Sequence, residues 1–326
     1  MRYLAADIGG TAVKCGLISE EGHVLLKTEA PVDFDQYQTP ILESALRTAE
    51  KLLREACGGD AAENTSAPEL AKRLEIGGIG ICAKGMIDKT NGVVAGSGGH
   101  LPGYVGSRFK EAFEEHFALE TRVINDANSA AVAEMWTGRA AGCRNAVVVT
   151  IGTGIGGGII ADGRILEGGR GFAGEIGHMT IQKDGPLSSC GNPGTFEDYA
   201  STGALRRRVC EALTAAGKKT ENISGREIFA LAEEGDKLIR SVIREWISDI
   251  AVGLVNLVYI FDPEIIVIGG GVSHQKKWLL DPLRETVKER LLPLYAERFR
   301  LEPAVHENDA GMIGAVYSFC PAGQKN

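Results

Sequence analysis

The pair Asn125-Asp126 carries residue types that could bind a substrate and accept a proton. The β-branched run Val123-Ile124 precedes the pair, and an alanine-rich helical pattern follows it. Asp126 is therefore expected at the carboxyl end of a strand and the start of a helix, where ligands bind in open α/β sheets. Asn and Asp are also favoured helix N-caps. Taken alone, the pair favours the capping role. Other residues of the chain are needed to distinguish this role from substrate binding.

Two glycine loops that contain threonine occupy equivalent places in the two halves of the chain. Gly9-Gly10-Thr11 follows an expected buried strand over residues 3–8, and Gly152-Thr153-Gly154 follows another over residues 146–151. After each loop the pattern continues with a strand, an Xaa-Gly turn and a further strand. This repeated order predicts two related lobes that face one cleft.

The second loop formally fits a dinucleotide fingerprint through Gly152, Gly154 and Gly157. That fingerprint needs a helix directly after the glycines, whereas residues 159–163 indicate a strand and a hairpin turn, which disfavours a NAD site. A third glycine loop, with Gly270 and Gly271, follows the apolar run 264–268. The sequence holds no Gly-x-x-x-x-Gly-Lys-Ser/Thr, so we expect the backbone N–H groups of these loops to hold a nucleotide phosphate chain without a P-loop.

Two charged residues accompany the first loop. Asp7 directly precedes it and could hold Mg²⁺ through water, because Mg²⁺ prefers carboxylate and phosphate oxygens. Lys14 is a candidate phosphate contact, and a solvated strand lysine is an equally good interpretation of it.

A set of polar side chains in the middle of the chain suits a polyhydroxylated substrate. Vicinal hydroxyls need bidentate acceptors, and the candidates are Asn125, Asp126, Glu175, His178 and Glu197. Phosphoryl transfer to an alcohol needs positioning, charge neutralisation and one base for the hydroxyl proton. Asp126 could be that base without an unusual pKa, because it need accept the proton only as the phosphorus–oxygen bond forms.

Composition limits the class of protein. The 326 residues exceed a typical single domain, and 44% apolar with 24% charged residues is ordinary for a soluble enzyme. A net charge of −8 and the absence of long basic runs argue against nucleic acid or a membrane surface as the partner. The seven cysteines are scattered and form no CxxC pair, which indicates reduced thiols and a cytoplasmic location.

These motifs together resemble the ROK family (repressors, uncharacterised frames, kinases) of the actin-like ATPase superfamily. The resemblance extends from Asp7 to Tyr317 and includes both phosphate loops, Asn125-Asp-Ala-Asn128, Glu175-Ile-Gly-His178 and Ile268-Gly-Gly-Gly271. It implies duplicated ribonuclease H-like α/β lobes with mixed sheets flanked by helices. It also implies ATP-dependent phosphorylation of a hexose, usually at the 6-hydroxyl, by a homodimer. Asp126 would be the base, and Asn125, Glu175, His178 and Glu197 would bind the sugar.

Two departures from the family pattern bear on the site. The family's zinc motif, Cys-x-Cys-Gly-x-x-Gly-Cys-x-Glu, aligns with residues 188–197, where Ser188 and Thr195 replace two cysteines. A structural zinc needs about four N or S ligands, and only His178 and Cys190 remain, so we predict no structural zinc. Many family glucokinases have Asn where this chain has His100. Either His100 replaces that sugar ligand, or the preceding Gly98-Gly99 opens the pocket for a larger glycoside.

The resulting prediction is a cytoplasmic hexose kinase that uses ATP and Mg²⁺ and is most similar to a glucokinase. A β-glucoside or an N-acetylhexosamine is the alternative acceptor. The rivals are a sugar-sensing repressor, disfavoured because the first phosphate loop begins at residue 7, and a silent sugar-binding protein, disfavoured by the retained Asp126. We expect an N-terminal lobe over residues 1–124 and a C-terminal lobe over residues 125–326, whose final helix packs back on the N-terminal lobe.

Overall fold

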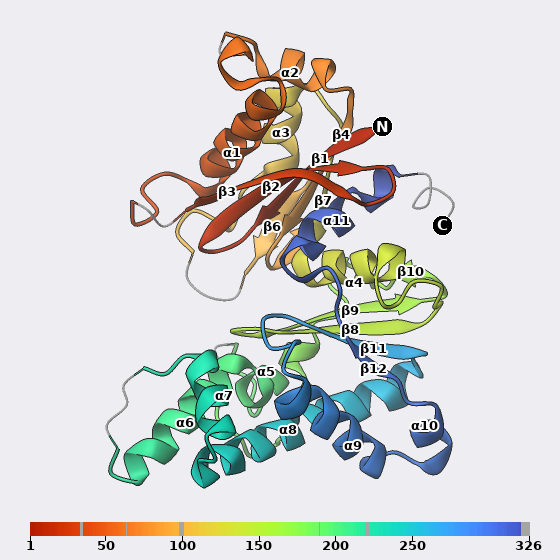
Figure 1. Ribbon diagram of the computed structural model, residues 1–326. Helices are drawn as coiled ribbons and strands as arrows, with labels where there is room; N and C mark the ends of the chain where they lie inside the picture. Colours follow the sequence, from red (N-terminus) through yellow and green to blue (C-terminus); the bar gives the residue numbers. More distant parts are fainter. Residues whose placement is uncertain (33–34, 63, 98–100, 189, 219–221, 321–326) are drawn as a thin grey trace. The chain divides into compact units, whose positions relative to one another are not determined.

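Two five-stranded mixed sheets form the framework of the computed structural model, which describes residues 1–32, 35–62, 64–97, 101–188, 190–218 and 222–320 (Figure 1). The first sheet has the order β3-β2-β1-β4-β7 and the second the order β10-β9-β8-β11-β12. In both sheets the central strand pairs antiparallel with the next strand of the chain and parallel with a later one. The prediction of a duplicated α/β fold is therefore confirmed.

The strands follow the expected runs closely. Those of the first sheet are β1 (Arg2–Ile8), β2 (Ala12–Ser19), β3 (Val24–Pro31), β4 (Ile76–Ala83) and β7 (Thr121–Asn125). Those of the second are β8 (Ala146–Ile151), β9 (Ile155–Ala161), β10 (Arg164–Ile165), β11 (Ile265–Gly269) and β12 (Leu301–Pro303). A separate hairpin contains β5 (Met86–Asp88) and β6 (Val93–Gly96). Because β9 begins at Ile155, Gly156 to Gly158 belong to this strand, and the second glycine loop is shorter than the sequence indicated.

The chain divides into two compact units, and each consists of several segments. The first holds residues 1–141, 163–173 and 308–326, and the second holds residues 142–162 and 174–307. This division differs from the boundary that we expected between residues 124 and 125. The reason is that α4 (Asp126–Thr137) packs against α11 (Ala310–Val316), which itself packs against β1 and β4 in the first unit.

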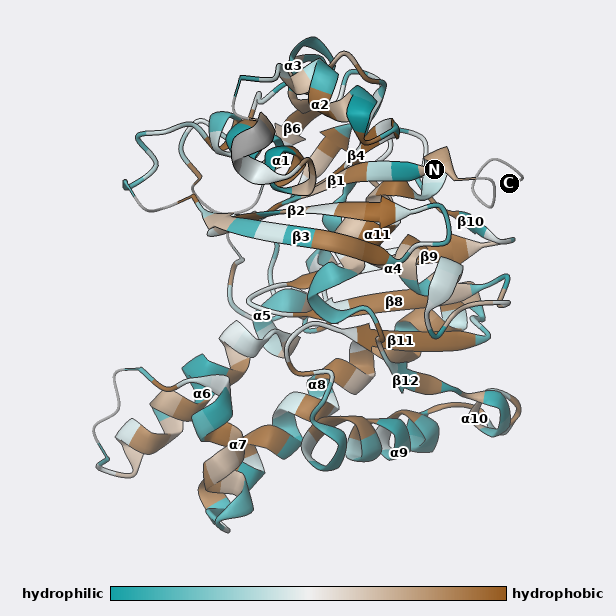
Figure 2. Ribbon diagram, turned by 45° about the horizontal axis from the view of Figure 1, so that its top comes forward, coloured by the Kyte–Doolittle hydropathy of each residue, from teal (hydrophilic) through white to brown (hydrophobic). Residues whose placement is uncertain are grey.

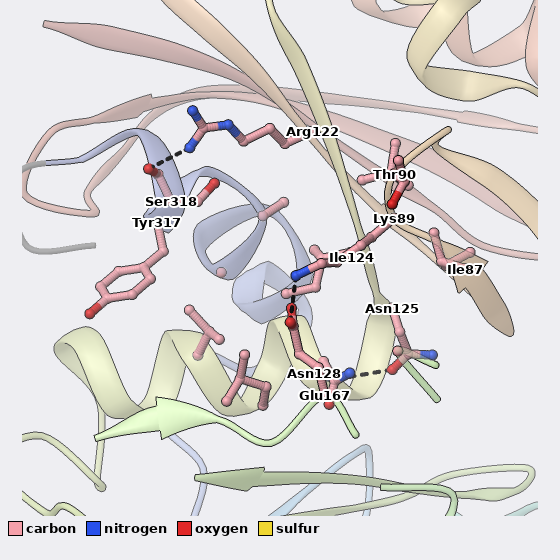
Figure 3. A pocket seen from close by; sticks show the side chains of 16 residues that line it. Ile87, Lys89, Thr90, Arg122, Ile124, Asn125, Asn128, Glu167, Tyr317 and Ser318 are labelled. Carbon is pink, nitrogen blue, oxygen red and sulfur yellow. Dashed lines mark hydrogen bonds and ion pairs between the residues drawn. The ribbon is translucent and has the colours of Figure 1, made fainter. Parts of the chain in front are cut away.

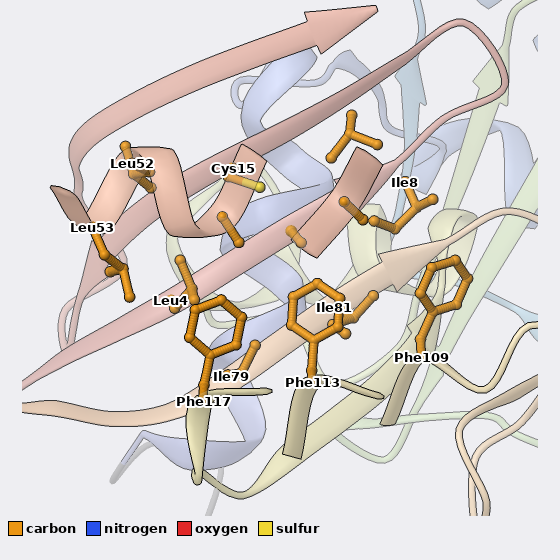
Figure 4. Packing of buried hydrophobic residues seen from close by; sticks show 14 of the residues in the cluster. Leu4, Ile8, Cys15, Leu52, Leu53, Ile79, Ile81, Phe109, Phe113 and Phe117 are labelled. Carbon is orange, nitrogen blue, oxygen red and sulfur yellow. The ribbon is translucent and has the colours of Figure 1, made fainter. Parts of the chain in front are cut away.

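Helices cover both faces of the first unit's sheet. One face carries α1 (Ile41–Ala56), α2 (Ala67–Arg73) and α3 (Phe109–Phe117), and the other carries α4 and α11 (Figure 1). Along β1, Leu4 and Ile8 enter the cluster beneath α1 and α3, while Tyr3 packs with residues of α11 and with Phe319. The three phenylalanines of α3 stand four residues apart, so all three point into that cluster (Figure 4).

The second unit places its helices against a sheet whose central strands are buried except at Thr150. These helices are α5 (Phe196–Ala200), α6 (Thr202–Ala215), α7 (Gly225–Glu233), α8 (Lys237–Phe261), α9 (Asp281–Arg290) and α10 (Pro293–Arg298). Figure 2 shows the apolar character of β8 and β11, each a run of buried aliphatic residues. Residues 196–215 form two helices and not one, because Ser201 caps α6 and its side chain accepts a hydrogen bond from the Ala204 N–H at 3.1 Å. Across the described part of the chain, no helix has the length and apolar character needed to span a membrane.

Candidate active site

Three parallel strands of the first unit bring candidate residues to one edge of the sheet. In the register of β1, β4 and β7, Asp7 lies beside Cys82 and Cys82 beside Ile124. Asn125 ends β7, and Asp126 is the first residue of α4. Burial raises the pKa of the Cys82 thiol, and the negative charges of Asp7 and then Asp126 raise it further. Both carboxylates therefore act on one small region at the carboxyl ends of these strands, the ligand-binding edge of an open α/β sheet.

The first glycine loop is a tight turn between β1 and β2. The N–H of Gly9 donates to the carbonyl of Ala12 at 3.0 Å, and the Tyr37 hydroxyl donates to the carbonyl of Gly10 at 2.7 Å. A Cβ on Gly9 would lie 2.9 Å from that Ala12 oxygen, so this turn needs glycine. Thr11 is exposed at the tip of the turn.

Asp7 and Lys14 face each other across the β1–β2 pair beneath this loop. Lys14 Nζ lies 4.0 Å from Asp7 Oδ2, and the Asp7 side chain is only 21% exposed. Burial raises the pKa of Asp7 above its ordinary value, and the charge of Lys14 opposes the increase. A Cβ on Gly311 of α11 would lie 2.9 Å from Asp7 Cγ, so the glycine leaves the space that the carboxylate occupies. A single carboxylate of this kind suits an ion that takes most of its other ligands from phosphate and water, as Mg²⁺ does.

Asn125 and Asp126 are joined by hydrogen bonds that serve the helix and the carboxylate together. Asn125 Oδ1 accepts from the Asn128 N–H at 3.0 Å, which makes Asn125 the N-cap of α4. Asn125 Nδ2 donates to the carbonyl of Gly85 at 2.9 Å and to Asp126 Oδ1 at 3.0 Å. The Asp126 side chain also accepts from the Ala127 N–H at 2.9 Å, and the residue is exposed. The capping role and an exposed carboxylate thus coexist, with Asn125 as the cap.

In the second unit, the second glycine loop is tied to a candidate sugar ligand. Glu197, on α5, accepts the Ile155 N–H through Oε2 at 2.9 Å. A Cβ on Gly154 would collide with this same oxygen. The hydroxyl of Thr202 donates to the carbonyl of Gly152 at 2.6 Å. These contacts fix the loop around Thr153 at the start of α5 and α6.

Glu175 and His178 lie together in the second unit, near Glu197. His178 Nε2 is 3.8 Å from Glu175 Oε2. Partial burial raises the pKa of Glu175, His178 opposes the increase and the Glu197 carboxylate adds to it. The other ring nitrogen of His178, Nδ1, is 3.1 Å from Cys190 Sγ. The sequence-predicted carboxylates and histidine of this unit are therefore neighbours.

The third glycine loop opens onto a cavity of about 730 Å³ in the second unit. Gly270 has a φ of +88°, and a Cβ there would collide with the carbonyl of Ile151, so the turn after β11 needs glycine. Gly271 lines the cavity together with residues of α6, of α7, of the loop between these helices and of the segment after β11: Thr202, Arg206, Asn222, Phe229 and Gln275. Sequence reasoning missed these five residues. The nearest local sequence signal, the Ser224–Glu227 capping box, predicts the start of α7 and gives no indication of a cavity beside it.

The predicted site residues fall into three groups. The first unit holds Asp7, Gly9, Gly10, Thr11, Lys14, Asn125 and Asp126, and the second holds Thr153, Gly154, Glu175, His178, Glu197, Gly270 and Gly271. Gly99 and His100 lie outside the described residues.

The duplicated ribonuclease H-like fold, with glycine loops after buried strands and a carboxylate at the head of α4, defines an actin-like ATPase-type protein. The model of the ROK family matches residues 3–320, and the chain belongs to this family. A β-glucoside kinase of Listeria monocytogenes is 32% identical, with 98% of this chain and 97% of the relative covered. A glucokinase of Halalkalibacterium halodurans is also 32% identical, with 96% and 93% covered.

The chain is also similar to solved structures that carry ligands. A ROK family glucokinase from Streptomyces griseus, in complex with glucose and AMPPNP, superimposes with a TM-score of 0.75 at 29% identity. The superposition covers 97% of this chain and 98% of that one. The family that the sequence motifs predicted is thus confirmed over nearly the whole chain.

Proposed function

We propose that this protein transfers the γ-phosphoryl group of ATP to the 6-hydroxyl of a hexose, as a glucokinase does. The observation that carries the proposal is the full-length similarity to glucokinases and β-glucoside kinases, combined with an exposed Asp126 at the head of α4. The Streptomyces griseus relative was solved with both kinds of substrate-site ligand, a hexose and an ATP analogue.

In the proposed reaction the sugar's 6-hydroxyl oxygen attacks the γ-phosphorus of ATP. The bond from this phosphorus to the bridging oxygen breaks, ADP leaves, and the hydroxyl proton passes to the Asp126 carboxylate. The side-chain amide of Asn125 donates a hydrogen bond to Asp126 Oδ1, and this bond holds the carboxylate in one orientation. A positioned base of this kind contributes about 10²–10⁴-fold to the rate.

We assign the binding roles from the local chemistry of each unit. Gly9, Gly10, Thr11, Thr153 and Gly154 would offer backbone N–H groups to phosphate oxygens, with Lys14 as a further contact. Asp7 would hold Mg²⁺, which neutralises phosphate charge when it is bound. The cavity beside Gly271 has room for the nucleoside, and Gly270 shapes its entrance. Asn125, Glu175, His178 and Glu197 would bind sugar hydroxyls, with Gly99 and His100 as further candidates.

Two other acceptors remain open within the same chemistry. A β-glucoside is favoured by the 32% identity to the Listeria monocytogenes β-glucoside kinase. An N-acetylhexosamine such as N-acetylmannosamine or N-acetylglucosamine is the third possibility. The homodimer implied by the family resemblance can be checked by light scattering on the same preparation.

A screen of acceptors tests the proposal. Purified protein is assayed for ATP-dependent release of ADP with glucose, mannose, N-acetylglucosamine, N-acetylmannosamine and cellobiose, with Asp126→Asn alongside. We expect turnover of at least one sugar and a fall in kcat of about 10²–10⁴-fold in the variant. The absence of turnover with every sugar, or a variant as active as the wild type, would show that the proposed mechanism is wrong.

A further inference from the structure

A cavity of about 400 Å³ lies along strand β7, entirely within the first unit (Figure 3). Small-molecule pockets commonly range from about 300 to 1,000 Å³. Strand β7 is the last strand of its sheet, so the cavity follows a sheet edge that no further strand covers. Among the described residues, Asp126 does not line the cavity, and Asn125 is the one proposed sugar ligand that does.

Apolar side chains from segments far apart in the sequence form part of the walls of this β7 cavity, beside polar and charged ones. Ile87 lies in β5, Ile124 in β7, Val132 in α4 and Ile165 in β10. Ile87 and Val132 are each only 3% exposed, whereas the side chains of Lys89 and Glu167 are 58% and 39% exposed, so the cavity extends from buried apolar residues to the surface. An apolar molecule that filled it would be removed from water, which stabilises binding by roughly 25 cal/mol for each Å² of apolar surface buried.

The charged groups of the lining are already paired with protein groups. Lys89 and Glu167 form an ion pair with each other. The Arg122 guanidinium pairs with Glu120 at 2.8 Å and also donates to the carbonyl of Ser318 at 2.7 Å. Because each of these charges already has a protein partner, the described lining residues offer no unpaired charge to a charged ligand, and we expect an uncharged one.

One polar group of the lining is unsatisfied. Asn128 is 5% exposed, and its Oδ1 has no hydrogen-bond partner among the described residues. A buried acceptor without a partner is unfavourable, because it has lost its hydrogen bonds to water and gained none in the protein. A hydroxyl group on a bound molecule could satisfy the carboxamide, because a hydroxyl donates and accepts.

We propose that the β7 cavity is a binding site for a small uncharged amphipathic alcohol. Its apolar body would lie against Ile124, Val132 and Ile165, and its hydroxyl would bond to the Asn128 carboxamide. Asn125 lines the cavity and donates a hydrogen bond to Asp126 Oδ1, so a molecule bound in the cavity would change the position of the Asp126 carboxylate through Asn125. This transmission rests on the proposed function of Asp126, whereas the binding site itself does not.

The binding test uses benzyl alcohol and ethylbenzene, a pair that differs by one hydroxyl in place of a methyl group. The protein is labelled at isoleucine δ1 methyl groups, and each compound is titrated by NMR. We expect benzyl alcohol to shift the signals of Ile87, Ile124 and Ile165 and to leave those of Ile79 and Ile81 unchanged. Ethylbenzene should bind at least threefold more weakly.

Three variants make the binding test specific. Ile165→Phe fills the cavity and should weaken benzyl alcohol binding at least tenfold. Ile260→Phe, at a position 64% exposed in α8, is the matched control and should bind as the wild type does. Asn128→Leu should bind the two compounds equally. Absent shifts at the three cavity methyls, or binding that survives Ile165→Phe, would overturn the proposed site.

Kinase activity tests the link to Asp126. At saturating benzyl alcohol the wild-type kcat should change at least twofold, and Ile165→Phe should show no change. A wild-type kcat that stays constant would overturn the link. Failure of the proposed kinase function would be seen separately, as the absence of turnover without benzyl alcohol, and the NMR result would still decide whether the site exists.

Discussion

The carboxamide of Asn125 donates a hydrogen bond to Asp126 Oδ1 at 3.0 Å while its oxygen accepts the Asn128 N–H at the same distance. One side chain therefore both starts α4 and orients the carboxylate that heads it. A single substitution at Asn125 would disturb both roles, but two substitutions can separate them.

Asn125→Ala should lower both stability and activity. Loss of the cap is expected to reduce the free energy of unfolding by about 1 kcal/mol. Loss of the amide donor leaves Asp126 without the contact from Asn125, and kcat should fall at least tenfold. Chemical denaturation and steady-state kinetics measure the two effects.

Asn125→Ser is the control that separates the roles, because serine also caps helices but cannot reach Asp126 with an amide. Its stability should return to within about 0.5 kcal/mol of the wild type while its activity stays low. Full activity in Asn125→Ser would contradict a role for the amide donor.

Asp7→Asn should stabilise the protein and inactivate it. Burial raises the pKa of Asp7 in the folded state above the unfolded-state pKa of 3.8. The group therefore contributes to stability at a pH below 3.8. This contribution is lost as the pH rises through the folded-state pKa. At neutral pH the buried charge is a cost, so its removal should add about 1 kcal/mol to the free energy of unfolding.

Denaturation of Asp7→Asn at two pH values checks the sign. The gain should be present at about pH 7 and should be smaller at an acidic pH, because the wild-type carboxyl, with its raised pKa, takes up a proton as the pH falls. Stabilisation that is the same at both pH values, or a loss of stability at pH 7, would be evidence against the burial argument.

Sequence patterns predicted most of this fold, because hydrophobic periodicity and the Gly-Thr loops depend on local residues. The strands expected over residues 3–8 and 146–151 are observed at Arg2–Ile8 and Ala146–Ile151. The two compact units do not divide at residue 124, because α4 packs against α11, a helix far later in the chain that the local sequence around residue 124 does not reveal.

Some residues of the candidate site could be predicted from the sequence and others could not. Asp126 and the glycine loops were visible because each sits in a compact motif. The cavity beside Gly271 was not, because Thr202, Phe229 and Gln275 come from separate elements that only the fold brings together. The unsatisfied Asn128 has no signature in the sequence, since it depends on which atoms surround the carboxamide.

Gly154→Ala should impair sugar binding through Glu197. The new Cβ would occupy the position of Glu197 Oε2 and break its hydrogen bond from the Ile155 N–H. We expect the sugar KM to rise at least fivefold. Gly152→Ala is the matched control, because a Cβ there meets no atom within 4 Å, and its KM should stay within twofold of the wild type. Equal effects of the two substitutions would argue against the Glu197 contact.

The sugar KM should rise on the acid side of the pH profile. Glu175 accepts hydrogen bonds from hydroxyls best as a carboxylate, and partial burial raises its pKa, so protonation begins at a higher pH than for a free glutamate. Measurement of KM between about pH 5 and 8 should show the increase in the wild type. Glu175→Gln should have a higher sugar KM that no longer changes as the pH is lowered. If the variant keeps the pH profile of the wild type, a group other than Glu175 causes the change in KM.

Metal content is the last test, and it concerns the cluster beside the sugar-binding candidates. Cys190 Sγ lies 3.1 Å from His178 Nδ1 and 3.5 Å from the Ser188 hydroxyl, whereas Thr195 caps α5 and donates to Asp198 Oδ2 at 2.6 Å. Zinc needs about four N or S ligands, so metal analysis of the wild type should find far less than one zinc per chain. Ser188→Cys/Thr195→Cys restores two thiolates and should bind about one zinc per chain. Without zinc, the double variant should lose about 1 kcal/mol through the missing cap. About one zinc per chain in the wild type would contradict the prediction. It would mean that ligands other than residues 188 and 195 complete a zinc site with His178 and Cys190.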